Sequence, residues 1–386
     1  MTDEIREPGV LDCAGVPVQD EQSRFTTQRR WRLCNQLIRQ IELEVGNVHS
    51  GTLNARLTQS CPGGSRTLRT TAQRGCLLAA TLSVYDTLIV GGGPAGLNAA
   101  LVLGRCGRRV LLCDAATPRN ARSRELHCFL TRDGIAPLDL LRLGRAELNQ
   151  YGIESRSIEV IDVRRAAEAF DVTLADDTQL AARTVLIACG VTDELPDITG
   201  LADCFGITAH HCPYCDGWES RGKSIVVIGR KKNGAALALA LKTWSDRIML
   251  CSNGAAQLRR VHREQLAEHA IAVNESPIRA VEHSAGHVNR LVLASNESIA
   301  CEAIFLVTTQ RIRSDLAGRL GCSLTRQGLV KTDHLGQTNV PGVYVVGDAS
   351  RDVQFAIVAA AEGAKAAVAV NKALQTRAGF ALFPVT

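Results

Sequence analysis

Short apolar runs alternate with longer Ala- and Leu-rich segments from Val84 onward. Runs of that length are typical of buried strands, whereas the longer segments predict helices. We expect strands at 84–90, 110–113, near 160, 170–174, 184–188, 224–228, 247–251, 303–307 and 343–346, and helices at 97–106, 137–151, 235–244 and 357–374. Strands that alternate with helices predict an α/β fold whose parallel sheets are covered on both faces.

Residues 1–84 differ from this pattern and are rich in Arg, Thr and Gln. Apolar spacing predicts one helix there, around Phe25–Val45. The Arg-rich composition suits a mitochondrial transit peptide, but the early acids Asp3 and Glu4 argue against it. The other interpretation is a poorly ordered N-terminal extension, or a start site placed too early.

Length and charge exclude several classes of function. A chain of 386 residues predicts two or three domains. No apolar run approaches the roughly 20 residues that a membrane span needs. The net charge of +5 is mild, basic residues are scattered and aromatic residues are scarce. Neither a membrane nor a nucleic-acid partner is therefore expected.

The number and spacing of the cysteines indicate whether the protein works in an oxidising or a reducing compartment. There are 14 of them, but their spacings are irregular and the chain is long and core-rich, unlike a secreted disulfide scaffold. The N-terminus is acidic and lacks the apolar region of a secretory signal. We therefore expect a reducing cytoplasm, in which only a special cysteine pair would carry out redox chemistry.

A glycine-rich turn predicts dinucleotide binding. It reads Gly91-Gly92-Gly93-Pro94-Ala95-Gly96, follows an apolar strand and opens a helix. Gly91 permits the tight turn, Gly93 lets the backbone approach a pyrophosphate, and Gly96 allows close packing of helix and strand. Asp114 ends the second strand, where its carboxylate can accept a hydrogen bond from a ribose hydroxyl.

A second glycine turn, Gly229–Gly234, is degraded. Lys231 stands where the backbone should approach a pyrophosphate, and the next strand ends at Ser252–Gly254, with neither an acid nor an arginine pair. Loss of two charge-assisted hydrogen bonds would cost roughly 3–6 kcal/mol, or about two to four decades of affinity. Unless neighbouring cations such as Lys232 or the Arg259–Arg260 pair compensate, NAD(P)H binding should be weak.

The stretch Cys212-Pro213-Tyr214-Cys215-Asp216 carries redox chemistry. Two cysteines at this spacing can close a disulfide ring, and the spacing commonly lowers a thiol's pKa. The adjacent Asp216 can supply or take the proton of each cycle. The alternative is half a zinc site completed by His210 or His211, but no second pair of ligands with suitable spacing is present.

From Tyr85 onward the chain resembles the thioredoxin reductase family of flavoprotein disulfide reductases. The motifs that carry the resemblance occur in order, namely Gly91–Gly96, Cys212–Gly217, Gly229–Gly234 and Thr338–Asp348. It implies two Rossmann-like, three-layer nucleotide-binding domains, the second inserted into the first. An FAD domain would comprise 85–200 and 310–386, and a central NAD(P)-binding-like domain 201–309.

The resemblance also implies residue roles and a homodimer. Gly347 and Asp348 match the family's FAD motif, in which the aspartate bonds the ribityl chain, and Gln354 matches a position near the isoalloxazine ring. Cys215 would be the flavin-side sulfur, and Cys212 the one that meets an external thiol or disulfide, on a small protein or a small molecule.

Two residue roles stay open from the sequence. Asp216 matches the family's general acid, and His211 either assists it or is a surface polar residue. Arg119-Asn120 either approaches the flavin or lies in a solvated loop.

The direction of electron flow is open as well. A reductase would draw on NAD(P)H or ferredoxin. The degraded second turn resembles instead a side branch of dithiol oxidases, which form disulfides in natural products and pass electrons to oxygen. A non-catalytic flavin sensor is a further alternative.

Overall fold

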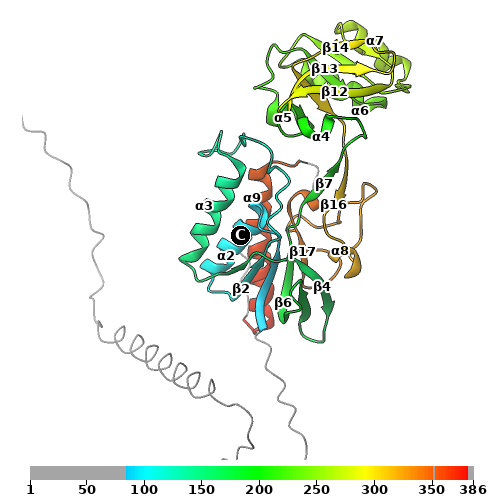
Figure 1. Ribbon diagram of the computed structural model, residues 1–386. Coiled ribbons are helices and arrows are strands. Elements are labelled where there is room, and N and C mark those ends of the chain that lie inside the picture. The colour runs from blue at the N-terminus through cyan, green and yellow to red at the C-terminus, as the bar shows by residue number, and fades with distance from the viewer. Residues whose placement is uncertain (1–83, 351–352, 381–386) are drawn as a thin grey trace, which may run out of the picture. The chain divides into compact units, whose positions relative to one another are not determined.

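The computed structural model describes residues 84–350 and 353–380 (Figure 1). The N-terminal segment 1–83, with the helix expected around Phe25–Val45, lies outside the described residues. Among the residues that are described, no helix is long and apolar enough to cross a membrane.

The first sheet has seven strands in the order β3-β2-β1-β6-β5-β4, with β17 also paired to β6. Its strands are β1 (Val84–Val90), β2 (Val110–Cys113), β3 (Glu154–Arg156), β4 (Val160–Arg165), β5 (Phe170–Leu174), β6 (Gln179–Ile187) and β17 (Val343–Val345). Pairing is parallel among β1, β2, β3, β6 and β17, and antiparallel from β6 through β5 to β4.

Helices cover one face of this sheet. They are α2 (Pro94–Arg105), α3 (Pro137–Asn149) and α9 (Ala356–Arg377), which lie together in Figure 1. Helices α2 and α9 approach closely because Gly363 has no side chain, and a Cβ at Gly363 would collide with the carbonyl oxygen of Ala95. The opposite face packs against the short helix α8 (Leu316–Arg319) and the segment that follows it.

The second sheet has five strands, all parallel, in the order β11-β10-β9-β15-β8. They are β8 (Ala209–His210), β9 (Ile225–Ile228), β10 (Ile248–Cys251), β11 (Ala272–Asn274) and β15 (Ala303–Leu306). Helices α6 (Lys231–Leu241) and α7 (Arg260–Glu268) pack on one face.

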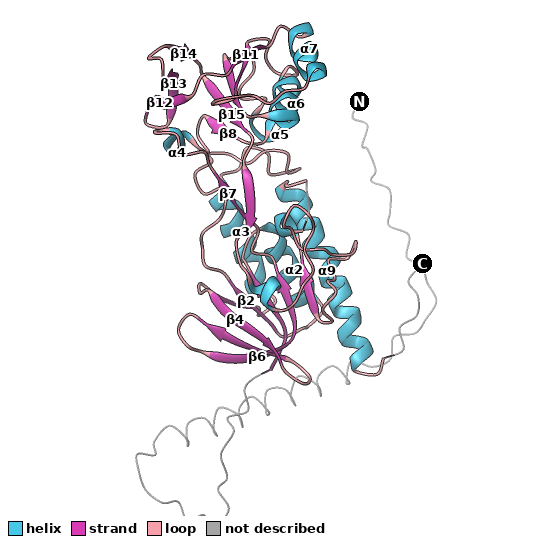
Figure 2. Ribbon diagram, turned by 90° about the vertical axis from the view of Figure 1, so that its right-hand side faces the viewer, coloured by secondary structure: helices cyan, strands magenta, loops and turns pink. Residues whose placement is uncertain are grey.

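A three-stranded antiparallel sheet covers the other face of the second sheet (Figure 2). It consists of β12 (Ile278–Ser284), β13 (His287–Leu293) and β14 (Ser298–Ala300). These three strands were not predicted from the sequence. Exposed positions such as Glu282 and Arg290 interrupt the apolar pattern, because only one face of this sheet is buried.

Short elements complete the description. Strands β7 (Val191–Glu194) and β16 (Thr309–Ile312) pair antiparallel, and α4 (Leu201–Cys204), α5 (Pro213–Asp216) and the 3₁₀ turn η1 (Gly347–Ala349) each form about one turn. Two predicted helices begin earlier than expected, at Pro94 and Lys231. For α2 the reason is that proline at the first helical position already has the required φ angle.

Candidate functional site

A cavity of about 330 Å³ collects most of the residues predicted to be functional. The predicted residues that line it are Gly91, Gly93, Pro94, Ala95, Asp114, His211, Cys215, Asp216, Gly347, Asp348 and Gln354. Of the predicted set, Gly96 and Cys212 lie outside the lining. Ligand pockets of this size are common in proteins, and they usually combine apolar walls with a few convergent polar groups.

The first glycine turn forms one wall of the cavity. Gly91 has φ +107° and lies against the backbone of Ala188, so a side chain would not fit there. Gly96 packs against the carbonyl of Gly91. Gly93 differs from both, because a Cβ at this position would meet no atom within 4 Å. The turn therefore presents bare backbone and the N-terminus of α2 to open space, as an anionic pyrophosphate requires.

Asp114 lies at the carboxyl end of β2, beside the glycine turn. A Cβ on Gly92 would come within 2.6 Å of its carboxylate, so Gly92 is needed for this approach. Arg145 of α3 forms an ion pair with the same carboxylate. The sequence analysis predicted a ribose contact for Asp114, and the structure adds an arginine that holds its side chain in place.

The redox motif also contributes residues to the lining of the cavity. Cys212 and Cys215 are joined in a disulfide. Cys212 caps the short helix α5, and its sulfur accepts a hydrogen bond from the backbone N–H of Cys215 at 3.1 Å. Cys215 lines the cavity and Cys212 does not, so the two sulfurs have different surroundings.

The two histidines before the motif have separate partners. His210 Nδ1 lies 3.0 Å from Asp216 Oδ1. His211 Nε2 instead lies 3.1 Å from an Nη2 of Arg119. From the sequence, His211 was a candidate to assist Asp216, but the direct contact with Asp216 belongs to His210. His210 is the last residue of β8 and His211 directly follows it, and neighbouring residues of an extended chain point to opposite sides.

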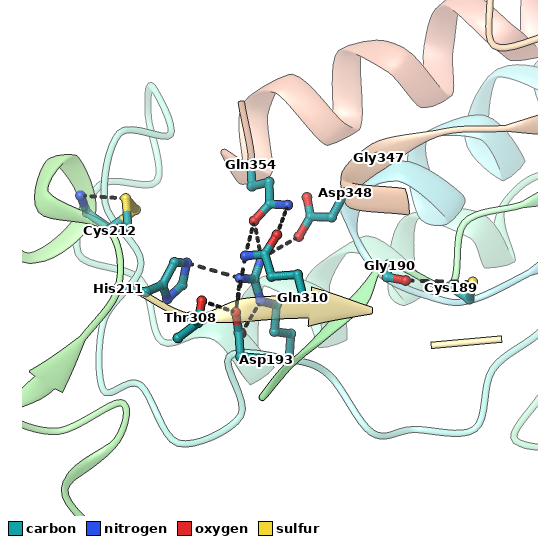
Figure 3. A network of polar contacts seen from close by, with 12 residues as sticks. Cys189, Gly190, Asp193, His211, Cys212, Thr308, Gln310, Gly347, Asp348 and Gln354 are labelled. Carbon is teal, nitrogen blue, oxygen red and sulfur yellow. Dashed lines mark hydrogen bonds and ion pairs between the residues drawn. A yellow bond between two sulfur atoms is a disulfide. The ribbon is translucent and has the colours of Figure 1, made fainter. Parts of the chain in front are cut away.

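Arg119 is the centre of a polar network that the sequence did not reveal, and Figure 3 labels its partners Asp193, His211, Asp348 and Gln354. Its Nε and Nη2 donate to the two carboxylate oxygens of Asp193 at 2.6 and 2.7 Å. Its Nη1 donates to Asp348 at 2.9 Å and to Gln354 at 2.6 Å. Arg119 thus connects β7 to two residues that the resemblance places at the flavin.

Gln310 on β16 completes this network. Its side chain exchanges hydrogen bonds with Gln354 at 2.7 and 3.0 Å and donates to Asp193 at 3.1 Å. Asp193 and Gln310 escaped the sequence analysis because neither lies in a recognisable motif. The only local signal was at Gln310, the last of three polar residues that directly follow the apolar run 303–307.

Comparison with known proteins decides the family. The model of the family described as pyridine nucleotide-disulphide oxidoreductase matches residues 85–363. The chain belongs to this family. It is a thioredoxin reductase-like oxidoreductase, as the resemblance noted in the sequence predicted.

Individual relatives agree with this assignment. A probable thioredoxin reductase of Arthroderma benhamiae is 29% identical over 69% of this chain and 74% of its own length. The thioredoxin reductase sirT of Leptosphaeria maculans is 28% identical over 76% and 95%. Among solved structures, HlmI is 37% identical, covers 76% of this chain and 94% of its own, and has a TM-score of 0.74. The putative thioredoxin reductase TrxB of Bacillus anthracis is 30% identical, covers 77% and 100%, and has a TM-score of 0.73.

The family name implies a pyridine nucleotide, but the second glycine turn does not fit one. Gly229 and Gly234 keep their close mutual packing. Lys231, at the middle position, has φ +55°, and its backbone N–H already donates to the carbonyl of Ala256 at 2.8 Å. The N–H that would face a pyrophosphate is therefore used inside the protein.

The Arg230 side chain covers the end of the neighbouring strand, β10. Its Nε donates to the carbonyl of Ser252 at 2.7 Å, and its Nη2 donates to the carbonyl of Asn253. These carbonyls follow β10, where a family member would bind the adenosine ribose. The Arg230 guanidinium, bonded to these two backbone carbonyls, occupies this position. It presents no bidentate pair of N–H groups to a 2′-phosphate.

We therefore predict weak binding of NADPH and NADH to this family member. With the two charge-assisted hydrogen bonds missing, affinity should be lower by about 10²–10⁴ than at an intact site. Fluorescence titration of either nucleotide should show no saturation at micromolar concentrations. The double variant Arg230→Ser/Lys231→Gly should bind more tightly, because it frees the strand end and the backbone N–H. Tight binding by the unchanged protein would contradict the prediction.

Proposed function

We propose that this protein is an FAD-dependent dithiol–disulfide oxidoreductase that exchanges electron pairs between Cys212–Cys215 and the flavin. The observation that carries the proposal is that Cys215 lines the same cavity as the glycine turn and Asp348. When bound, FAD would supply two-electron redox chemistry that no protein side chain can supply alone.

The residues of the cavity fit FAD. The open space at Gly93 and the start of α2 suit its pyrophosphate, and Asp114 suits a ribose hydroxyl. We propose that Asp348 bonds the ribityl chain and that Gln354 lies near the isoalloxazine ring. Both side chains are already held in place by Arg119.

The different surroundings of the two sulfurs support different roles. We propose that Cys212 exchanges with the substrate and that Cys215 is the flavin-side sulfur. In the reducing direction, the Cys212 thiolate attacks a substrate disulfide and forms a mixed disulfide, which releases one substrate thiolate. The Cys215 thiolate then attacks Cys212, which restores the Cys212–Cys215 disulfide and releases the second substrate thiolate. In the oxidising direction, the same bonds form and break in reverse order.

Each of these exchanges moves protons, and the pair formed by Asp216 and His210 can carry them. Asp216 directly follows Cys215 and lines the cavity, and the 3.0 Å contact with His210 orients its carboxylate. A side chain held by a second group in this way is a typical general acid–base. We propose that Asp216 gives and takes the thiol protons.

Net oxidation of small dithiols with oxygen as the acceptor is the second candidate function. The specific observation in its favour is the closed second glycine turn, where Arg230 and the Lys231 N–H are both engaged. Because this turn is closed to a nicotinamide donor, electrons would enter from the substrate dithiol. A ferredoxin-type donor would be the corresponding choice for the reductase.

We propose a homodimer and a cytoplasmic location, as the resemblance and the cysteine usage imply. Eight cysteines of the described residues are free thiols, which suits a reducing compartment. We also propose the division into an FAD domain, 85–200 with 310–386, and a central domain, 201–309.

Substitution Gly93→Val tests the cofactor site. A valine side chain would project into the space proposed for the pyrophosphate, so the purified variant should lose its flavin absorbance. Gly318→Val is the matched control, because a Cβ at Gly318 also meets no atom within 4 Å, but Gly318 lies outside this cavity. Equal flavin content in the two variants would contradict the assignment, and colourless wild-type protein would refute the proposed function.

Substitutions Cys212→Ser and Cys215→Ser test the dithiol mechanism. Each should abolish turnover of dithiothreitol while FAD stays bound, because neither sulfur belongs to the proposed FAD motifs. Cys106→Ser, which removes an exposed free thiol elsewhere, should leave turnover unchanged. In air, oxygen uptake and peroxide formation without any nicotinamide would support the oxidase. Full activity of the Cys212→Ser enzyme would exclude the mechanism.

Substitution Asp216→Asn tests proton transfer. It keeps the shape of the side chain and should slow turnover by about 10²–10⁴, the usual effect of losing a general acid–base. His210→Gln should slow turnover less, because His210 acts by orienting Asp216. Steady-state rates with dithiothreitol, compared at equal flavin content, measure both effects. An Asp216→Asn enzyme that keeps the wild-type rate would rule out the role.

A further inference from the structure

Asp193 fixes the guanidinium of Arg119 in one orientation. The Asp193 side chain is only 3% exposed, and its carboxylate accepts from Arg119 Nε and Nη2, from Thr308 Oγ1 and from Gln310 Nε2. Burial alone would raise the pKa of Asp193, but its hydrogen bonds and the charge of Arg119 outweigh burial and lower it. Asp193 is therefore ionised. Its carboxylate forms a bidentate ion pair with the Arg119 guanidinium, which leaves Arg119 little freedom.

The remaining N–H groups of Arg119 reach three other parts of the chain. Nη1 donates to Asp348 after β17 and to Gln354 before α9, and the second hydrogen of Nη2 points to His211 Nε2. An arginine side chain has five N–H donors and no acceptor. Here all five have a partner, and one of those partners is the histidine next to Cys212 (Figure 3).

This contact determines the state of the His211 ring. Because a guanidinium can only donate, His211 Nε2 must accept, and its lone pair must be free. The ring is then neutral and carries its hydrogen on Nδ1. A protonated imidazole would set two N–H donors and two positive charges against each other at 3.1 Å.

The charges around His211 act in both directions. Burial is the largest cause that lowers the pKa of His211, and the charge of Arg119 lowers it further. The carboxylates of Asp193, Asp216 and Asp348 act against this and raise it. Among the described residues, Arg119 is the cation that lowers the pKa of His211 and that also contacts its ring.

We propose that Arg119 is a positioning residue which keeps His211 neutral, with its hydrogen on Nδ1, and orients that ring beside the redox-active cysteines. This inference rests on the proposed function of the same site. It gives the loop after β2 a role in the chemistry of a disulfide that is far from it in the sequence. Asp348, which is proposed to bond the flavin, and His211 are then partners of the same guanidinium.

Removing Arg119 should favour the protonated form of His211 over the neutral form. Without the cation, three carboxylates face the ring, and the protonated form becomes favourable at higher pH. Acidification of the wild-type protein breaks the Arg119–His211 contact only below the ordinary pKa of histidine. In an Arg119→Gln enzyme, the loss of activity on the acid side should therefore begin about one pH unit higher.

The first experiment measures flavin reduction by dithiothreitol in anaerobic stopped flow, between about pH 5.5 and 8. The rate of each variant is divided by the wild-type rate at the same pH, which cancels the ionisation of the probe. The ratio for Arg119→Gln should fall as the pH falls. Arg119→Lys keeps the positive charge but loses the planar set of N–H donors. Its ratio should be below one and nearly independent of pH. A pH-independent ratio for Arg119→Gln would overturn the inference.

Arg183→Gln is the matched control. Arg183 on β6 and Asp86 on β1 form an ion pair of 2.6 Å, the same length as the pair of Arg119 with Asp193, and neither residue lines the cavity. Its rate ratio should stay near one at every pH. A ratio that falls with pH in this control as well would show that loss of any such ion pair, rather than the contact with His211, causes the effect.

The second experiment does not depend on flavin reduction. The imidazole nitrogens of the full chain, labelled with ¹⁵N-histidine, are followed by NMR, and His211→Gln assigns the signal. Wild-type His211 should show the Nδ1–H tautomer at pH 7, and in Arg119→Gln it should titrate at higher pH. An Nε2–H tautomer, or an unchanged titration, would refute the role of Arg119. If dithiothreitol fails to reduce the wild-type flavin, the proposed function fails, while this measurement still decides about Arg119.

Discussion

The ion pair between Arg119 and Asp193 is the interaction on which the arrangement of the site depends. Asp193 is almost completely buried, so its charge requires a partner held at short range, and the 2.6 Å contact provides one. Because that partner is an arginine with further donors, the same charge compensation also fixes Asp348, Gln354 and His211. Neutralising one buried carboxylate thereby aligns residues from four separate segments of the chain.

The two glycine turns illustrate how a similar local pattern can lead to different chemistry. At Gly91–Gly96 the backbone faces open space, and the helix N-terminus is available for an anion. At Gly229–Gly234 the glycines pack equally closely, but the Lys231 N–H and the Arg230 side chain are bonded to backbone carbonyls. A dinucleotide site needs the close packing and also unsatisfied donors. At the second turn one of these donors, the Lys231 N–H, is already used.

Much of the fold follows from patterns that are local in the sequence. The strands at Val84–Val90 and Val110–Cys113 have the predicted bounds, because short and mostly apolar runs mark buried strands. Strands β12–β14 escaped prediction because one face is exposed and their pattern is broken by charged residues. Helix starts at Pro94 and Lys231 were misplaced, since the end of a helix depends on backbone geometry more than on composition.

The sequence by itself determined the family, the disulfide spacing and the glycine turn, because each depends on residues close together along the chain. Only the tertiary structure decided which histidine contacts Asp216, since His210 and His211 differ merely in the side to which they point. It also decided the partners of Arg119, which lie 74 and 229 residues away in Asp193 and Asp348. Contacts at such separations arise when strand ends meet at one edge of a sheet, and no local pattern records them.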